Sequence, residues 1–246
     1  MMVPGLRTLR EDVARAGVIL PVLLLCLLTL PVSALAGQDL GPLAIVHGQV
    51  FPATGAAPIQ DGVVLIRGNR IEAVGSAEAV PIPADARVLD AAGGTVMPGL
   101  FNAHIHHGAF AEVRAQFLAQ GVTSVCDLGA PDEEYLGYRE TTYLGLPVSR
   151  GFYAGPFLAP PGGYPDGVHG TQGYNREVVG VEEAREGVRE VAGLGASFVK
   201  IALDPSWDRE DPVPMFDLAE TRSIVQEAHD RGLRVRAHMI QIPYFP

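Results

Sequence analysis

The sequence predicts an α/β protein in which a small all-β unit is followed by a barrel of parallel strands and covering helices. Residues 43–92 consist of short runs rich in β-branched residues, separated by turn signals. Beyond Gly99, apolar runs of strand length alternate with stretches of helical period, which is the pattern of repeated βα units. The 246 residues suffice for one large or two modest domains, and we place the boundary between residues 95 and 96.

The all-β unit is expected to contain a hairpin. Strand-like runs cover residues 43–51 and 62–75, and Gly68-Asn69 divides the second run as a two-residue turn would. His47 lies in the first run and is most simply a structural residue.

The barrel region contains strand-like runs separated by three helical stretches. We expect strands at residues 101–107, 122–129, 147–155, 197–204 and 233–240. We expect helices at residues 109–121, 180–195 and 217–232. The apolar faces of the first two helices are expected to be Phe110, Val113, Phe117 and Leu118, and Val181, Ala184, Val188 and Val191. Asp217 and Glu220 have the spacing of a capping box at the start of the third.

The overall charge argues against a nucleic-acid partner. The chain has 18 Lys and Arg residues against 28 Asp and Glu residues, whereas binding to a phosphate backbone requires clustered positive charge. We therefore expect no nucleic-acid partner. The expected partner is a small-molecule substrate, as the candidate site residues below indicate.

The first 36 residues have the pattern of a secretory signal peptide. Three arginines precede an apolar run that ends in Ala34-Leu35-Ala36, an A-x-A cleavage site. Pro21 and Pro31 interrupt the run, which is shorter than the roughly 20 residues of a spanning helix. We expect cleavage after Ala36 and export to the periplasm or the extracellular space, with only transient membrane contact. The alternatives are a retained membrane anchor and a lipid anchor at Cys26. Without this leader only Cys126 remains, so no intrachain disulfide can form.

Two long connections are expected to form the walls or lids of a pocket. Residues 155–179 are rich in Gly and Pro, and residues 203–216 contain Trp207 among four acidic residues. Loops after the strands of a barrel build its working face, so His169 and Trp207 are candidates for substrate contact. Disorder is the alternative for the first connection.

Three histidines stand in "FNAHIHHG", residues 101–108. His104 and His106 are two positions apart, so on a strand both imidazoles project to the same side, at the end where a barrel places its reactive groups. His107 projects to the other side and is expected to be structural or supporting. An isolated H-x-H pattern does not by itself distinguish a metal site from polar residues at a strand end.

Lys200 is the only lysine in the chain, against 17 arginines, and it stands inside the apolar run "SFVKIAL". An amine can lose its charge and react, whereas a guanidinium cannot. We therefore expect a catalytic role for Lys200 rather than a side chain that extends from a strand end to solvent.

His238 stands at the end of the last expected strand. A single barrel would bring it together with His104, His106 and Lys200, and three imidazoles with an anionic oxygen donor suit zinc. Arg236 shares a strand face with His238, and we expect it to pair with Asp127 inside the barrel.

The stretches "GGTVMPGLFNAHIHHG", "GASFVKIALD" and "EAHDRGLRVRAHM", in this order, resemble the amidohydrolase superfamily, especially the branch of imidazolonepropionase and the secreted prolidase-like dipeptidases. The resemblance implies a TIM-type (β/α)8 barrel joined to a small β-sandwich, a portion of which is residues 37–95. It also implies a carbamate on Lys200, formed with carbon dioxide, that bridges two divalent metal ions, as a rule zinc. His104 and His106 would bind one ion and His238 the other.

The implied activity is hydrolysis of a carbon–nitrogen bond, amide or cyclic amide, by a metal-activated water. We count five strands in residues 96–246, so the barrel is expected to be partial and truncated after strand five, and this chain is expected to be neither stable nor active alone. The family's further metal histidine and catalytic aspartate have no counterpart here. A non-catalytic exported barrel remnant or binding protein and a deaminase-like hydrolase are the alternatives. Substrate and oligomeric state are not predicted.

Overall fold

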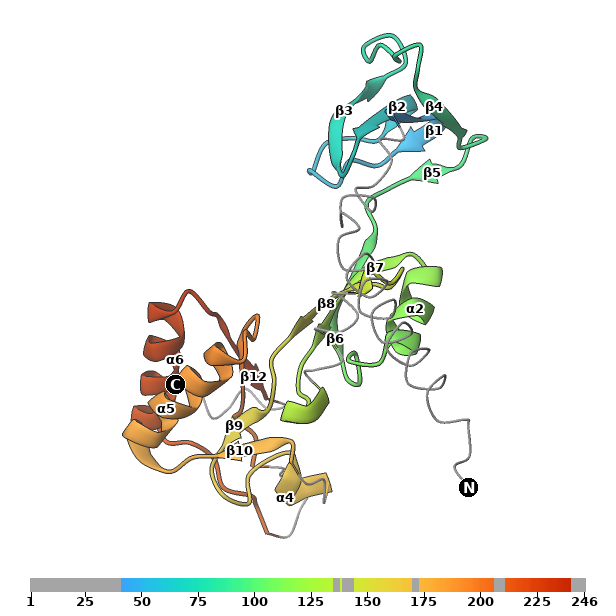
Figure 1. The fold of residues 1–246 in the computed structure, drawn as a ribbon. Helices are drawn as coiled ribbons and strands as arrows, with labels where there is room; N and C mark the ends of the chain where they lie inside the picture. Colours follow the sequence, from blue (N-terminus) through green and yellow to red (C-terminus); the bar gives the residue numbers. More distant parts are fainter. Residues whose placement is uncertain (1–40, 135–137, 139–143, 170–172, 206–210, 240–246) are drawn as a thin grey trace, which may run out of the picture. The chain divides into compact units, whose positions relative to one another are not determined.

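The computed structural model describes residues 41–134, 138, 144–169, 173–205 and 211–239 (Figure 1). Backbone contacts divide the chain into two compact units between Met97 and Pro98. The expected leader, residues 1–36, and Trp207 lie outside the described residues. Among the described residues, no helix has both the length and the apolar character that crossing a bilayer requires.

The first unit is a five-stranded sheet. Its strands are β1 (Leu43–Val50), β2 (Ile59–Arg67), β3 (Arg70–Ser76), β4 (Arg87–Asp90) and β5 (Thr95–Val96). β1 is antiparallel to β2 and parallel to β4 and β5. Arg67 pairs with Arg70 across the turn, and Gly68 there has a φ of 58°, which glycine adopts without strain. The expected hairpin is therefore confirmed.

The core of this unit lies on one face of the sheet. It is formed by Ala44, Val46, Val63, Leu65 and Val80. A sandwich has two sheets, and the described residues of this unit form one of them.

The second unit alternates strands and helices. Its elements are β6 (Leu100–Ile105), α2 (Ala111–Ala119), β7 (Val122–Asp127), β8 (Arg150–Tyr153), β9 (Phe157–Ala159), α4 (Asp166–His169), β10 (Asn175–Glu177), α5 (Gly180–Gly193), β11 (Val199–Ala202), α6 (Leu218–Asp230) and β12 (Val235–His238). The strands form two parallel sheets, ordered β6-β7-β8 and β10-β9-β11-β12.

Backbone hydrogen bonds connect the two sheets where β8 leads into β9. Ser197 N, just before β11, donates to Tyr153 O at the end of β8 over 2.8 Å, which joins the two sheets, while Ala154 N, just after β8, donates to Asp127 O of β7 over 3.1 Å. In the order of parallel strands, β8 and β9 therefore share one position between β7 and β11, and β12 follows β11. The expected α/β class is confirmed, but within the described residues no strand pairing joins β12 to β6, so the barrel is not closed.

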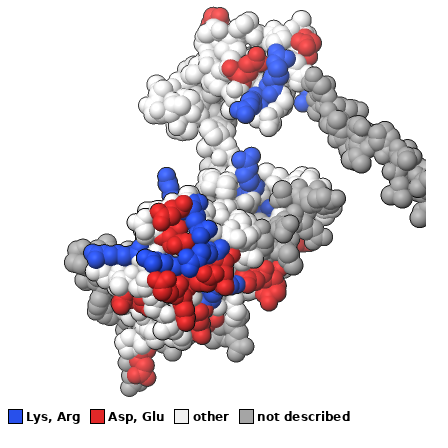
Figure 2. Space-filling model, turned by 60° about the vertical axis from the view of Figure 1, so that its left-hand side comes forward, with Lys and Arg blue, Asp and Glu red and all other residues white. Residues whose placement is uncertain are grey.

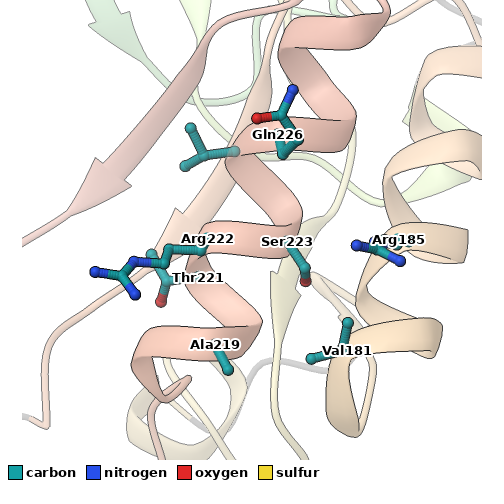
Figure 3. A pocket seen from close by; sticks show the side chains of 8 residues that line it. Val181, Arg185, Ala219, Thr221, Arg222, Ser223 and Gln226 are labelled. Atoms are coloured by element: carbon teal, nitrogen blue, oxygen red, sulfur yellow. The ribbon is translucent and has the colours of Figure 1, made fainter.

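Helices α5 and α6 lie side by side and cover the second sheet (Figure 1). The core between them and the sheet includes Leu158, Val188, Val191, Ile201 and Ile224, each at most 1% exposed. Burial of Val188 and Val191 confirms the expected inner face of α5. Basic and acidic side chains lie next to one another on the face that carries these helices (Figure 2).

The expected capping box begins α6. Glu220 N donates to Asp217 Oδ1 over 2.8 Å, and Asp217 N donates to Glu220 Oε2 over 2.9 Å. The other oxygen of Glu220, Oε1, accepts a hydrogen bond from Gly180 N over 2.8 Å. One carboxylate therefore caps the first turns of both helices.

The expected apolar face of the first helix is wrong in one respect. Phe110 precedes α2 and is 49% exposed, whereas the buried residue of the helix is Arg114. Arg114 Nη1 donates to Ser149 O over 3.2 Å, and its guanidinium lies 4.7 Å from the centre of the Tyr138 ring. A backbone acceptor and an aromatic face make burial of this cation tolerable, which the apolar period does not reveal.

Candidate active site

A cavity of about 540 Å³ lies at the carboxyl ends of β6, β11 and β12. It is lined by His104, Leu128, Lys200, Arg236, Ala237, His238 and Met239. Lys200 is paired with Arg236, and Ala202 with His238, in the parallel register of β11 and β12. The carboxyl ends of parallel strands meet at one edge of a sheet, and this brings three of the predicted site residues into one cavity.

Lys200 is the buried cation of this cavity. Its side chain is 2% exposed, and Nζ lies 5.3 Å from the centre of the Phe157 ring. Burial, and next the positive charge of Arg236, lower the pKa of Lys200 from 10.5 to about 8. A substantial fraction of the amine is therefore neutral slightly above physiological pH, and a neutral amine is a nucleophile.

His104 is the second-last residue of β6, and His106 directly follows the strand. Their ring centroids are 5.4 Å apart. Partial burial, and next the charge of Lys200, lower the pKa of His104, so its imidazole is neutral at pH 7. Nδ1 of His106 lies 3.3 Å from Gly129 O; because a carbonyl oxygen only accepts, Nδ1 is the donor of this bond. His106 is not among the residues that line the cavity.

His238 is held by two neighbours. Its Nε2 lies 3.3 Å from Oδ2 of Asp204, a buried carboxylate. Its ring stacks on Tyr164 with centroids 3.9 Å apart and planes at 9°. Burial and Lys200 lower the pKa of His238, while Asp204 opposes this shift. Nε2 of the exposed His169, in α4, lies 3.4 Å from the Tyr164 hydroxyl, so Tyr164 connects the predicted substrate-loop histidine with His238.

The expected ion pair between Arg236 and Asp127 is wrong. Nη1 of Arg236 donates to Ala103 O over 3.1 Å, and its guanidinium lies 4.2 Å from the centre of the Phe198 ring. The Asp127 carboxylate instead accepts hydrogen bonds from backbone amides and from a tyrosine hydroxyl. Hydrogen-bond donors that lie beyond the ends of β6 and β7 therefore satisfy the Asp127 carboxylate in place of the Arg236 guanidinium.

Asp204, Tyr164 and Tyr138 were not singled out from the sequence. For Asp204 a signal was present, because it stands four positions after Lys200 and two after Ala202, on the same side of an extended chain. Tyr164 lies in a Gly- and Pro-rich loop, and Tyr138 lies beyond the end of a strand. Neither segment has the regular hydrophobic spacing of a helix or strand, so the sequence does not indicate which of its side chains reach the site.

The donor set is compatible with divalent metal ions. Within the described residues no group of three or more His, Cys, Asp or Glu side chains is close enough to hold an ion. However, His104, Lys200 and His238 share one cavity, and the 5.4 Å between the His104 and His106 rings is near the separation of about 5 Å for two imidazoles that share one zinc at about 2.1 Å per bond. A carbamate on Lys200 would add the anionic oxygen that this set otherwise needs. Ligand roles for the four residues stay a prediction.

The chain is similar to known proteins both in sequence and in fold. No family profile matches the chain. The enamidase of Eubacterium barkeri is 28% identical over 198 residues, covering 73% of this chain and 45% of the enamidase. The 5-methylthioadenosine/S-adenosylhomocysteine deaminase of Symbiobacterium thermophilum is 45% identical over 65 residues, covering 26% of this chain and 15% of the deaminase.

Solved structures extend the similarity to the fold. A putative prolidase from Bifidobacterium longum is 28% identical, with a TM-score of 0.66 over 81% of this chain and 50% of the prolidase. A prolidase complexed with N-methylphosphonate-L-proline is 26% identical, with a TM-score of 0.66 over 80% of this chain and 56% of that protein. The chain belongs to the amidohydrolase superfamily.

Its similarity to enamidase and to prolidases confirms the resemblance seen in the three sequence stretches. An amidohydrolase structure with 24% identity and a TM-score of 0.69 supports the same fold. The chain spans about half the length of the enamidase and of these solved structures, at 45% and 50% to 56%, and 15% of the deaminase.

Proposed function

We propose that this chain carries the metal-binding part of a hydrolase that cleaves a carbon–nitrogen bond, in an amide or a cyclic amide of a small molecule. The observation that carries the proposal is the cavity in which His104, Lys200 and His238 meet. These residues come from three different strands of a fold that is similar to that of a prolidase, in a chain whose sequence is also similar to an enamidase.

Four side chains would hold the metal. His104 and His106 would bind one divalent ion and His238 a second, with Lys200 as the bridging carbamate; imidazole nitrogen and carboxylate-like oxygen suit zinc. When bound, two zinc ions supply the Lewis acidity that activates a water and polarises the scissile carbonyl.

Lys200 is prepared for reaction with carbon dioxide. Burial lowers its pKa to about 8, so the neutral amine is accessible under mild conditions. Its nitrogen lone pair would form a bond to the carbon of carbon dioxide, one C–O π pair would move to oxygen, and the amine would release a proton to solvent. The product is a carbamate with one negative charge, and Arg236, in register with Lys200, lies where it can balance that charge.

His238 would be kept neutral and oriented by its surroundings. The Tyr164 ring fixes the plane of the imidazole, and Asp204 lies within ion-pair distance of Nε2. The opposing effects of burial and of Asp204 on its pKa leave a neutral ring, the form that binds a metal, as the favoured state at pH 7.

Carbamate formation and zinc uptake test the proposal. The chain is treated with ¹³C-labelled bicarbonate and zinc, and ¹³C NMR and metal analysis follow, beside hydrolysis assays on an aminoacyl-proline, an N-acyl amino acid and a cyclic amide. We expect a carbamate signal and bound zinc in the wild type, and loss of the signal in Lys200→Met and in Lys200→Arg. His229→Ala, an exposed substitution near the end of α6 and outside the cavity, is the matched control and should keep both. A wild type that takes up neither carbon dioxide nor zinc would favour a non-catalytic binding protein.

Deamination is a second candidate reaction. The 65-residue match to a 5-methylthioadenosine/S-adenosylhomocysteine deaminase is the observation that favours it. One metal site serves both reactions, because in each an activated water attacks an electrophilic carbon and an amine leaves. Ammonia release from 5-methylthioadenosine, compared with amine release from the amide substrates, separates the two.

A further inference from the structure

Asp127 is a completely buried carboxylate at the end of β7, and every oxygen of its side chain is used. Oδ2 accepts hydrogen bonds from Gly108 N over 2.7 Å and from the Tyr138 hydroxyl over 3.0 Å. Oδ1 accepts from Gly129 N over 3.3 Å. A buried carboxylate is costly unless its oxygens are hydrogen-bonded in this way.

The two glycines whose backbone amides donate to Asp127 both lie close to His106. Gly108 follows His106 by two residues. Gly129 provides the carbonyl oxygen that lies 3.3 Å from Nδ1 of His106. Asp127 therefore fixes the chain segment that carries His106, and it also holds, through Gly129 N, the residue whose carbonyl oxygen accepts the hydrogen bond of the imidazole.

Close packing makes this arrangement specific. A Cβ added to Gly108 would lie 2.0 Å from the Tyr138 hydroxyl oxygen. A Cβ added to Gly129, whose φ is 154°, would lie 2.1 Å from the Phe157 ring. Tyr138 is held from its other side by the Arg114 guanidinium, 4.7 Å from the ring centre. Glycine is therefore needed at both positions for the amides to reach the carboxylate.

We propose that Asp127, held by Tyr138, is the positioning residue for His106: it fixes the imidazole with the proton on Nδ1 and leaves the lone pair on Nε2. This inference rests on the proposed function for its purpose, since a histidine ligand needs one unprotonated nitrogen at a fixed place. The inference also gives a role to Tyr138, which is not one of the four predicted metal ligands.

The test combines a tautomer measurement with zinc affinity. The full chain, labelled with ¹⁵N-histidine and free of metal, is studied by NMR, and the resonances of His106 are assigned by their loss in His106→Asn. Zinc binding is measured by calorimetry with zinc chloride alone. We expect wild-type His106 in the Nδ1–H form. In Asp127→Asn we expect a mixture of tautomers and zinc binding weaker by roughly 10- to 100-fold, and in Tyr138→Phe a smaller change in the same direction.

Ser149→Ala is the matched control. Ser149 is also buried, and its hydroxyl, which has one proton to donate, lies 3.0 Å from Arg114 O and 2.5 Å from Val122 O. Among the described residues its side chain forms no hydrogen bond with Asp127, Tyr138 or His106. We expect this variant to lose stability and to keep the Nδ1–H tautomer and the zinc affinity.

Two outcomes would overturn the inference: an unchanged His106 tautomer in both Asp127→Asn and Tyr138→Phe, or an equal change in Ser149→Ala. Tyr138→Phe keeps the ring and decides the matter if Asp127→Asn does not fold. If the wild type binds no zinc, the proposed function fails, while the tautomer spectra of the metal-free chain still decide whether Asp127 positions His106.

Discussion

Replacing Lys200 with methionine should stabilise the metal-free chain at neutral pH. Lys200 is 2% exposed and its pKa in the folded chain is about 8, against 10.5 ordinarily, because of burial and then Arg236. A pKa lowered by this amount corresponds to about 3 kcal/mol by which the folded state is disfavoured while the amine is charged. Methionine has a similar length and no charge, so the variant avoids this cost.

The dependence on pH follows from the same numbers. Below about pH 8 the amine is protonated in both states, and the full cost is present. Between pH 8 and 10.5 the folded state loses its proton first, the unfolded state binds more protons, and the wild type gains stability. The advantage of Lys200→Met should therefore fall from about 3 kcal/mol at pH 7 towards zero above pH 10.5.

Urea denaturation of both proteins at several pH values, with chelator and without carbon dioxide, measures this difference. His104 and His238, whose pKa is lowered by burial and in part by Lys200, are already mainly neutral above pH 7. The other titrating groups, such as tyrosines, are common to the two proteins and cancel in the comparison. A difference in the free energy of unfolding that is constant from pH 7 to 10.5, or a variant that is less stable at pH 7, would refute the reasoning about the buried amine.

Three further outcomes are expected. Glu220→Ala removes the caps of Gly180 N and Asp217 N and should cost about 1 to 2 kcal/mol of unfolding free energy in urea. Val188→Ala, at 0% exposure in α5, should cost about 1 to 3 kcal/mol by the same measurement, and a value near zero would mean that this core relaxes around the lost methyl groups. N-terminal sequencing of the protein secreted by an expressing bacterium should begin at Gly37, and an intact Met1 would instead favour a retained anchor.

Much of the fold followed from periodic patterns. Burial of Val188 and Val191 and the capping box of Asp217 were predictable, because helical spacing and capping are local properties of the sequence. Closure of the barrel is a long-range property, and the strand pairing that would show it is not found between β6 and β12 in the described residues.

The candidate site was predictable where a residue type was unusual for its position. A single lysine within an apolar strand pointed to Lys200, and the structure places it in a cavity with His104 and His238. The partner of Asp127 was not predictable, because its donors are backbone amides of Gly108 and Gly129, and no side-chain pattern marks a backbone donor. Whether the four predicted ligands bind metal stays a prediction.

Cys126, the only cysteine beyond the expected leader, offers a direct way to follow the site region in time. Cys126 is 1% exposed in β7, next to Asp127. A thiol-reactive reagent can reach its sulfur only when the β6-β7-β8 sheet opens, so the labelling rate reports how often that sheet separates. Once the expected leader is removed, no other thiol competes for the reagent. Slower labelling after zinc is added would show that metal binding at the barrel mouth stiffens the strand beneath it.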